Sequence, residues 1–90
     1  MSQAIVDPGE LRRFAHNLKR FNSELQTQML ALQAQLLNLG ETWRDAEQQK
    51  FTEEFEATMR SIGRFVDAAN EHVPFLLRKA DRVEDYLRQR

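Results

Sequence analysis

The chain contains no cysteine among its 90 residues, so disulfide bonds and thiolate metal sites are both excluded. Its two histidines, His16 and His72, share no helical face with further ligand residues, and we expect neither a metal nor a cofactor. No stretch approaches the roughly 18 apolar residues that a membrane span requires. The first ten residues lack the basic region and apolar run of a secretory signal peptide.

An excess of charge of one sign is also missing. The 13 basic and 14 acidic residues leave a net charge of −1, which does not predict a nucleic-acid-binding protein. Basic clusters occur at 12–20 and 78–90, but acids such as Asp81 and Glu84 interrupt the second one. Phosphate binding requires an excess of basic side chains on one face, so we interpret both clusters as solvated helix surface.

Three glycines, two prolines and no strand-like alternation predict an all-α chain. A first helix of about 8–38 is predicted to begin after Asp7 as N-cap, with Pro8 at its first position and Glu10 completing a capping box. Gly40 is expected to end it as a left-handed cap. Steps of three and four residues connect the apolar side chains Leu11, Phe14, Leu18, Phe21, Leu25, Met29, Leu32, Leu36 and Leu39.

A second helix of about 44–88 follows a turn at about 39–43. Thr42 is its predicted N-cap, with Asp45 reaching back from three residues further on. Pro74 is expected to kink this helix without ending it, because the apolar spacing keeps its phase across the proline. A turn this short makes residues 1–90 one antiparallel two-helix hairpin. Its apolar series is Phe51, Phe55, Met59, Ile62, Val66, Ala69, Val73, Leu76, Ala80, Val83 and Leu87.

More apolar surface is present than one hairpin can cover. Beside the second series lies another stripe of apolar and small residues, and the first helix adds leucines on its own flank. Each large side chain left in water forgoes about 1.5–3 kcal/mol of burial. We therefore expect two hairpins to form a four-helix bundle. The expected dimer interface contains Leu30, Leu37, Phe65, Ala68, His72, Phe75 and Tyr86.

The charges indicate how two hairpins would pair. Residues 1–20 and 78–90, which lie together in a hairpin, hold nine basic and five acidic residues, a net of +4. Residues 21–77 hold four basic and nine acidic residues, a net of −5. Each hairpin is thus positive at its termini and negative toward its turn. Antiparallel copies attract and parallel copies repel, within a screening length of about 8–10 Å.

The only tryptophan, Trp43, follows the predicted turn. We place it in the first turn of the second helix, where its ring would plug the open end of the hairpin and stack toward Phe51. A role in recognition by an exposed ring is the alternative. A hairpin of this length, with Trp43, Asp45 and Phe51 at the turn, resembles the WXG family of early-secreted-antigen-like proteins, which carry Trp-x-Gly there and an aromatic residue eight positions after the tryptophan.

The resemblance covers nearly the whole chain and implies an antiparallel hairpin dimer, formed with itself or with a paralogous hairpin. It also implies a substrate or adaptor of type VII secretion, with a larger secreted protein as a further partner. Two positions depart from the family pattern. Asp45 replaces the glycine, and Arg90 stands four residues after Tyr86, where the Tyr-x-x-x-Asp/Glu export signal has an acid.

The expected function is therefore a dimeric protein–protein interaction module without catalysis. General acid–base chemistry requires a cleft that excludes water, which a two-helix hairpin does not offer. The resemblance implies export without a signal peptide. The alternative is a cytoplasmic scaffold dimer that is never secreted. The sequence leaves open whether the partner is a second copy or another hairpin.

Overall fold

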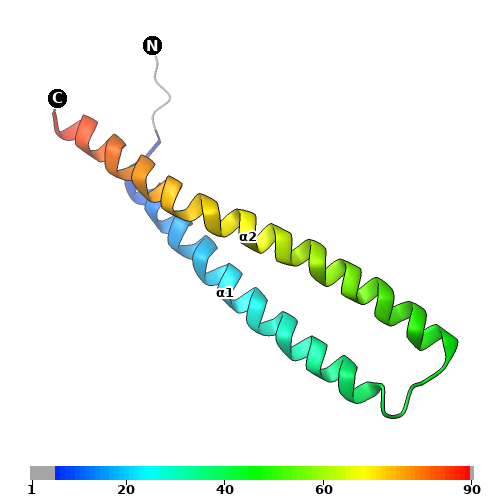
Figure 1. The fold of residues 1–90 in the computed structure, drawn as a ribbon. Helices are drawn as coiled ribbons and strands as arrows, with labels where there is room; N and C mark the ends of the chain where they lie inside the picture. Colours follow the sequence, from blue (N-terminus) through cyan, green and yellow to red (C-terminus); the bar gives the residue numbers. More distant parts are fainter. Residues whose placement is uncertain (1–5, 90) are drawn as a thin grey trace.

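The computed structural model describes residues 6–89, and within them the chain forms two α-helices and no strand. Helix α1 spans Pro8–Leu39 and helix α2 spans Ala46–Arg88. They run antiparallel as a hairpin, with both chain ends at one end and the turn at the other (Figure 1). The predicted all-α hairpin is confirmed. Arg90 and the first five residues lie outside the described part.

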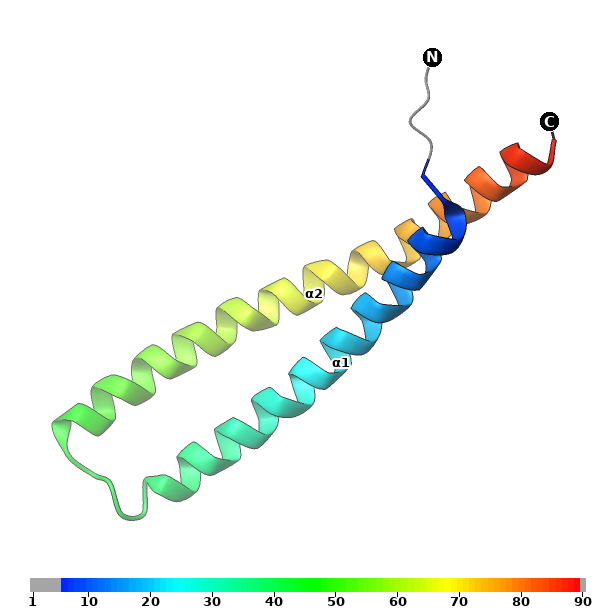
Figure 2. The ribbon, with the colours of Figure 1, turned by 180° about the vertical axis from the view of Figure 1, so that it is seen from behind.

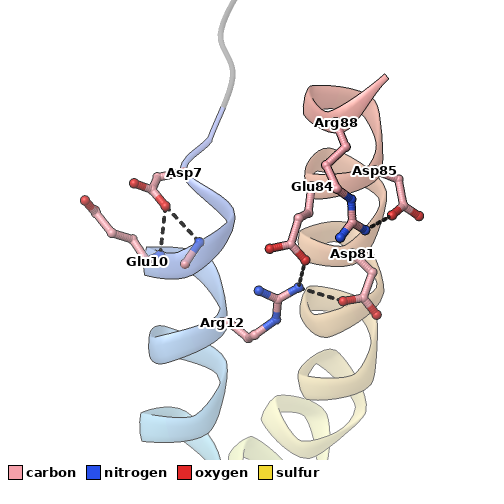
Figure 3. Close-up of polar contacts among 8 residues, drawn as sticks. Asp7, Glu10, Arg12, Asp81, Glu84, Asp85 and Arg88 are labelled. Atoms are coloured by element: carbon pink, nitrogen blue, oxygen red, sulfur yellow. Dashed lines mark hydrogen bonds and ion pairs between the residues drawn. The ribbon is translucent and has the colours of Figure 1, made fainter. Parts of the chain in front are cut away.

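The start of α1 follows the prediction at Asp7 and Pro8, but the Glu10 side chain accepts no hydrogen bond from the Asp7 N–H, so the predicted capping box is not completed. The Asp7 carboxylate accepts hydrogen bonds from the backbone N–H groups of Gly9 at 2.8 Å and Glu10 at 3.2 Å (Figure 3). These contacts satisfy two of the donors that a helix leaves unpaired at its N-terminus. Pro8 at the first position has no N–H to leave unpaired.

The end of α1 differs from the expectation at Gly40. Gly40 has φ −61° and ψ −14°, so the predicted left-handed cap is wrong. The chain instead continues in right-handed turns, in which the N–H of Gly40 reaches the carbonyl of Leu36 and that of Trp43 reaches the carbonyl of Leu39. These bonds satisfy the terminal carbonyls of α1, so no left-handed residue is required.

The start of α2 also differs from the expectation. Asp45 is itself the N-cap, and its carboxylate accepts a hydrogen bond from the N–H of Gln48 at 2.9 Å. Thr42, the predicted cap, donates its hydroxyl to the carbonyl of Leu39 and so serves the end of α1. Trp43 accordingly lies in the turn and not in α2. An aspartate caps better than a threonine, which explains why the helix begins after Asp45.

The face of α2 that packs on α1 is a strict heptad series, and every member is buried or half-buried. We name this heptad series the core seam: Gln48, Thr52, Phe55, Met59, Ile62, Val66, Ala69, Val73, Leu76, Ala80, Val83 and Leu87. The series continues past Pro74, which lies inside α2 without ending the helix.

The packed face of α1 keeps five members of the predicted series, which are half-buried, but Ala15 and Asn22 take the places of Phe14 and Phe21. The five are Leu11, Leu18, Leu25, Met29 and Leu36. Ala15 and Asn22 are its fully buried members, whereas Phe14 and Phe21 are 56% and 52% exposed. Placing these two phenylalanines between the helices was therefore wrong. Small side chains at the contact let the two backbones approach closely, and the neighbouring large rings then remain outside.

The hairpin is a rod of 67 × 21 × 14 Å. Its radius of gyration is 20.1 Å, against about 12 Å for a compact domain of this length. The six buried residues within 6–89 all lie at 15–22 and 66–80, toward the chain ends. The helices lie closest there and separate toward the turn (Figures 1 and 2). Tight packing thus covers only part of the hairpin.

Candidate interaction surface

An aromatic row extends from the turn along α2. The ring centroids of Trp43 and Phe51 are 5.9 Å apart, and those of Phe51 and Phe55 are also 5.9 Å apart. The ring planes are tilted by 37° and 33°, a geometry typical of attractive aromatic pairs. The expected contact of Trp43 with Phe51 is present. Trp43 is half-buried, so one part of the ring packs while another part remains accessible.

All seven residues expected at the dimer interface are exposed in the single hairpin. The exposed fractions are 78% for Leu37, 68% for Leu30 and 60% for Tyr86. Phe65 and Phe75 are 51% and 49% exposed, and Ala68 and His72 are also exposed. Since no part of residues 6–89 covers them, these side chains are available to a partner.

The hairpin does not bring these seven residues to one side. Phe65, Ala68, His72, Phe75 and Tyr86 each come one residue before a member of the core seam, so they lie on one flank of α2. By contrast, Leu30 and Leu37 each come one residue after a half-buried residue of α1.

In an antiparallel pair of right-handed helices, the residues that precede the contact positions lie on the same side of the hairpin. Those that follow them lie on the opposite side. The predicted set is therefore divided between two surfaces. We name them the aromatic side, which holds Phe65, Phe75 and Tyr86, and the leucine side, which holds Leu30 and Leu37.

Phe14 and Phe21 extend the aromatic side onto α1, because they precede Ala15 and Asn22. Leu32 and Leu39, both 46% exposed, lie on the same flank. Sequence reasoning missed these four because it placed them between the helices. The signal that could have found them is the parallel series Leu11, Ala15, Leu18 and Asn22, which has the same spacing with smaller residues.

Toward the turn, where the helices separate, a groove of about 250 Å³ opens between them. Its only ionisable lining residue is Glu56. In residues 6–89, no three histidine, aspartate or glutamate side chains gather closely enough to hold a metal ion. Neither described helix is both long and apolar enough to cross a membrane. The lining residues are Gln33, Leu36, Leu37, Gly40, Gln48, Thr52, Phe55 and Glu56.

At the opposite end, Arg12 joins the two helices. One of its terminal nitrogens (Nη2) lies 2.7 Å from an Asp81 carboxylate oxygen and 3.1 Å from one of Glu84 (Figure 3). Hydrogen bonds to Asp81 and then Glu84 raise the pKa of the Arg12 guanidinium, so it stays charged wherever the protein is folded. Asp81 and Glu84 therefore balance part of the positive charge at this end.

Comparisons with known proteins agree with the hairpin and its turn motif. The family model for proteins of 100 residues with WXG, named WXG100, matches residues 3–86. Among solved structures, the chain is similar to the secreted protein EsxB of Bacillus anthracis strain Sterne. The two are 28% identical over 96% of this chain and 98% of that chain, with a TM-score of 0.76.

The structure of wild-type EsxB in the P21 space group is likewise 28% identical, over 93% of this chain and 97% of that chain, with a TM-score of 0.75. No curated protein gives a significant match. The family model covers nearly the whole chain, and the observed fold, turn and aromatic row agree with it. The chain therefore belongs to the WXG100 family, with Trp-Arg-Asp in place of Trp-x-Gly at its turn.

Proposed function

We propose that this protein is a dimeric interaction module, in which two hairpins pack through their aromatic sides as an antiparallel four-helix bundle. The observation that carries the proposal is the row of half-exposed rings Phe14, Phe21, Phe65, Phe75 and Tyr86 on one side of a very thin molecule. Exposed apolar patches of this kind mark interaction sites in soluble proteins.

The accessible surface supports the need for a partner. The hairpin exposes 7015 Å², whereas a compact monomer of 10.6 kDa exposes about 5,500 Å². The excess of roughly 1,500 Å² exceeds the roughly 800 Å² that each chain buries in a standard interface. A dimer through one face of standard size would therefore remove about half of this excess.

Light scattering at micromolar concentration tests the dimer, and one variant on each side of the hairpin tests the face. We expect a dimer for the wild-type protein and at least tenfold weaker association for Phe65→Ala, since truncation removes a large apolar contact. Leu30→Ala, a matched truncation on the leucine side, should leave the association unchanged. A monomeric wild-type protein would contradict the proposal.

We further propose that the dimer is a substrate or adaptor of a type VII-like secretion system. Membership of the WXG100 family and similarity to a secreted protein support this role. Fractionating the producing cells with and without the secretion ATPase tests it, because export should depend on that ATPase.

The alternative is a scaffold dimer that stays in the cytoplasm. It is favoured by Arg90, which stands where the export signal of the family has an acid. In the fractionation experiment, protein that remains in the cells under both conditions would support the scaffold and contradict the secretion role. The Arg90→Glu variant, which restores the signal pattern, provides the control.

A further inference from the structure

We infer that the partner on the aromatic side is a second copy of this chain, aligned so that the two-fold axis passes between Val66 and Asp67 of each α2. The inference rests on the proposed function, because it specifies the register of the proposed dimer. It follows from the order of side chains along the exposed flank of α2.

That flank is a second heptad series parallel to the core seam. We name it the outer seam, and each of its members comes one residue before a member of the core seam. All twelve members are exposed, so the whole series is available to a partner. The outer seam is Glu47, Phe51, Glu54, Thr58, Ser61, Phe65, Ala68, His72, Phe75, Lys79, Arg82 and Tyr86.

Face-to-face packing of antiparallel hairpins determines which helices meet. The two-fold axis of such a dimer lies in the interface, perpendicular to the long axes of both hairpins. Rotation about it reverses the direction of each helix, but each helix of the second copy lies at the same edge of the bundle as its equivalent in the first copy. Helix α2 therefore packs against α2 of the second copy, and α1 against α1. The outer seam must then be complementary to its own reverse.

Reversed about the point between Val66 and Asp67, the outer seam complements itself at the centre. Phe65 comes opposite Ala68, and Ala68 opposite Phe65, so a ring meets a methyl group on both sides of the axis. One heptad further out, His72 comes opposite Ser61 and Phe75 opposite Thr58. Large side chains opposite small ones allow knobs-into-holes packing without voids.

The outer pairs are complementary in charge. Lys79 comes opposite Glu54 and can form an ion pair, and Arg82 comes opposite the ring of Phe51, as in a cation–π contact. Tyr86 comes opposite Glu47, which can accept a hydrogen bond from the phenol. The same arrangement brings the positive terminal end of one hairpin beside the negative turn end of the other.

Neighbouring registers lack this agreement. A shift of one heptad toward the turn keeps an ion pair, Lys79 with Glu47, but mismatches side-chain size. It sets Ala68 opposite Thr58, two small residues that leave a void, and Phe75 opposite Phe51, two large rings. A shift the other way sets Ser61 opposite Lys79 and Thr58 opposite Arg82, so both basic groups lose their partners. The charge pattern thus argues against the second shift, and the pairing of large with small side chains argues against the first.

Charge reversal at the pair of Glu54 and Lys79 tests the register. Each single variant, Glu54→Lys or Lys79→Glu, places like charges together twice in a homodimer, and we expect its dissociation constant to rise on the order of tenfold. An equimolar mixture of the two variants restores both ion pairs and should recover wild-type affinity by sedimentation equilibrium. The two positions are 25 residues apart on α2, about 37 Å, so no contact within one chain explains the recovery.

Glu53→Lys is the matched control, since it makes the same charge change one residue away from the outer seam. In its mixture with Lys79→Glu, the mixed dimer keeps one Glu54–Lys79 pair but still sets the other Glu54 opposite the new glutamate, so its affinity should stay below that of the wild-type dimer. Helicity by circular dichroism verifies that all variants fold. If the wild-type protein dimerises but the mixed variants do not recover, the register is wrong and the proposed function stands. A monomeric wild-type protein would overturn both.

Discussion

At the residue scale, the turn shows how few side chains determine where two helices end and begin. Thr42 and Arg44 donate hydrogen bonds to the carbonyls of Leu39 and Gly40 at the end of α1. Asp45 accepts one at the start of α2. The aspartate in Trp-Arg-Asp is therefore a helix cap, and a glycine at the same position, which has no side chain to accept the bond, caps less well by about a few tenths of a kcal/mol.

Trp43 permits a direct test of the turn. Its half-buried ring contacts Phe51, so we expect Trp43→Ala to lower the stability by about 1–2 kcal/mol, roughly half the loss for a fully buried ring. Thermal melting by circular dichroism measures this loss. Trp43→Phe keeps an aromatic contact and should lose less. An unchanged melting temperature for Trp43→Ala would favour the recognition role of the ring.

Asn22 is the buried polar residue of α1, 1% exposed, and its amide nitrogen donates to the Asn70 side-chain oxygen at 2.9 Å. Asn22→Asp removes the donor and buries a carboxylate, so we expect a loss on the order of 3 kcal/mol at neutral pH. Asn70→Asp is the control, because position 70 is exposed and the new carboxylate still accepts from Asn22. Equal stability of the two variants would contradict this role of the buried amide.

At the scale of elements, α2 carries two parallel heptad series, one packed on α1 and one exposed. Its stability depends on the first, and its partner is proposed to use the second. Gly63 lies outside both, because it follows Ile62 and faces the leucine side. A methyl group built on Gly63 has no neighbour within 4 Å, so an alanine fits there without rearrangement.

Gly63→Ala should therefore stabilise the protein by about 0.5–1 kcal/mol, which is the usual gain from replacing a helical glycine. For a domain of this size, that gain raises the melting temperature by about 2–8 °C. The dissociation constant of the dimer should not change, because position 63 faces away from the aromatic side. Gly40→Ala is the contrast, since its methyl group would lie 3.2 Å from the Leu37 carbonyl oxygen and gain less. Weaker dimerisation of Gly63→Ala would place the interface on the leucine side.

At the scale of the whole molecule, the rod has opposite charges at its two ends, with +4 near the termini and −5 over the rest. In an antiparallel dimer these charges attract, and salt screens the attraction. The screening length falls from about 10 Å at 0.1 M salt to about 3 Å at 1 M.

We therefore expect the dissociation constant of the dimer to rise several-fold between about 0.1 M and 1 M sodium chloride, measured by sedimentation equilibrium. Sodium sulfate at the same ionic strength separates screening from apolar burial, because sulfate strengthens burial. A dimer that tightens in sodium chloride would indicate parallel copies, whose like charges repel.

The two helices, their antiparallel order and the cap at Asp7 were predictable from the sequence, because capping residues and apolar spacing are local signals. The family was likewise predictable, from Trp43 and Phe51 at a turn near the middle of a short chain. The tertiary structure alone decided which flank of α1 faces α2. Phe14 and Ala15 are one residue apart, and the spacing of both series is compatible with either choice.

The packing of the two helices also places Leu30 and Leu37 on the side opposite Phe65 and Phe75, although all four are exposed and apolar. Helical periodicity shows that a helix has several apolar flanks, but the neighbouring helix determines which flank is covered. Close approach through small residues such as Ala15 favours one of them, and that preference depends on side-chain shape across the contact, which local spacing does not encode.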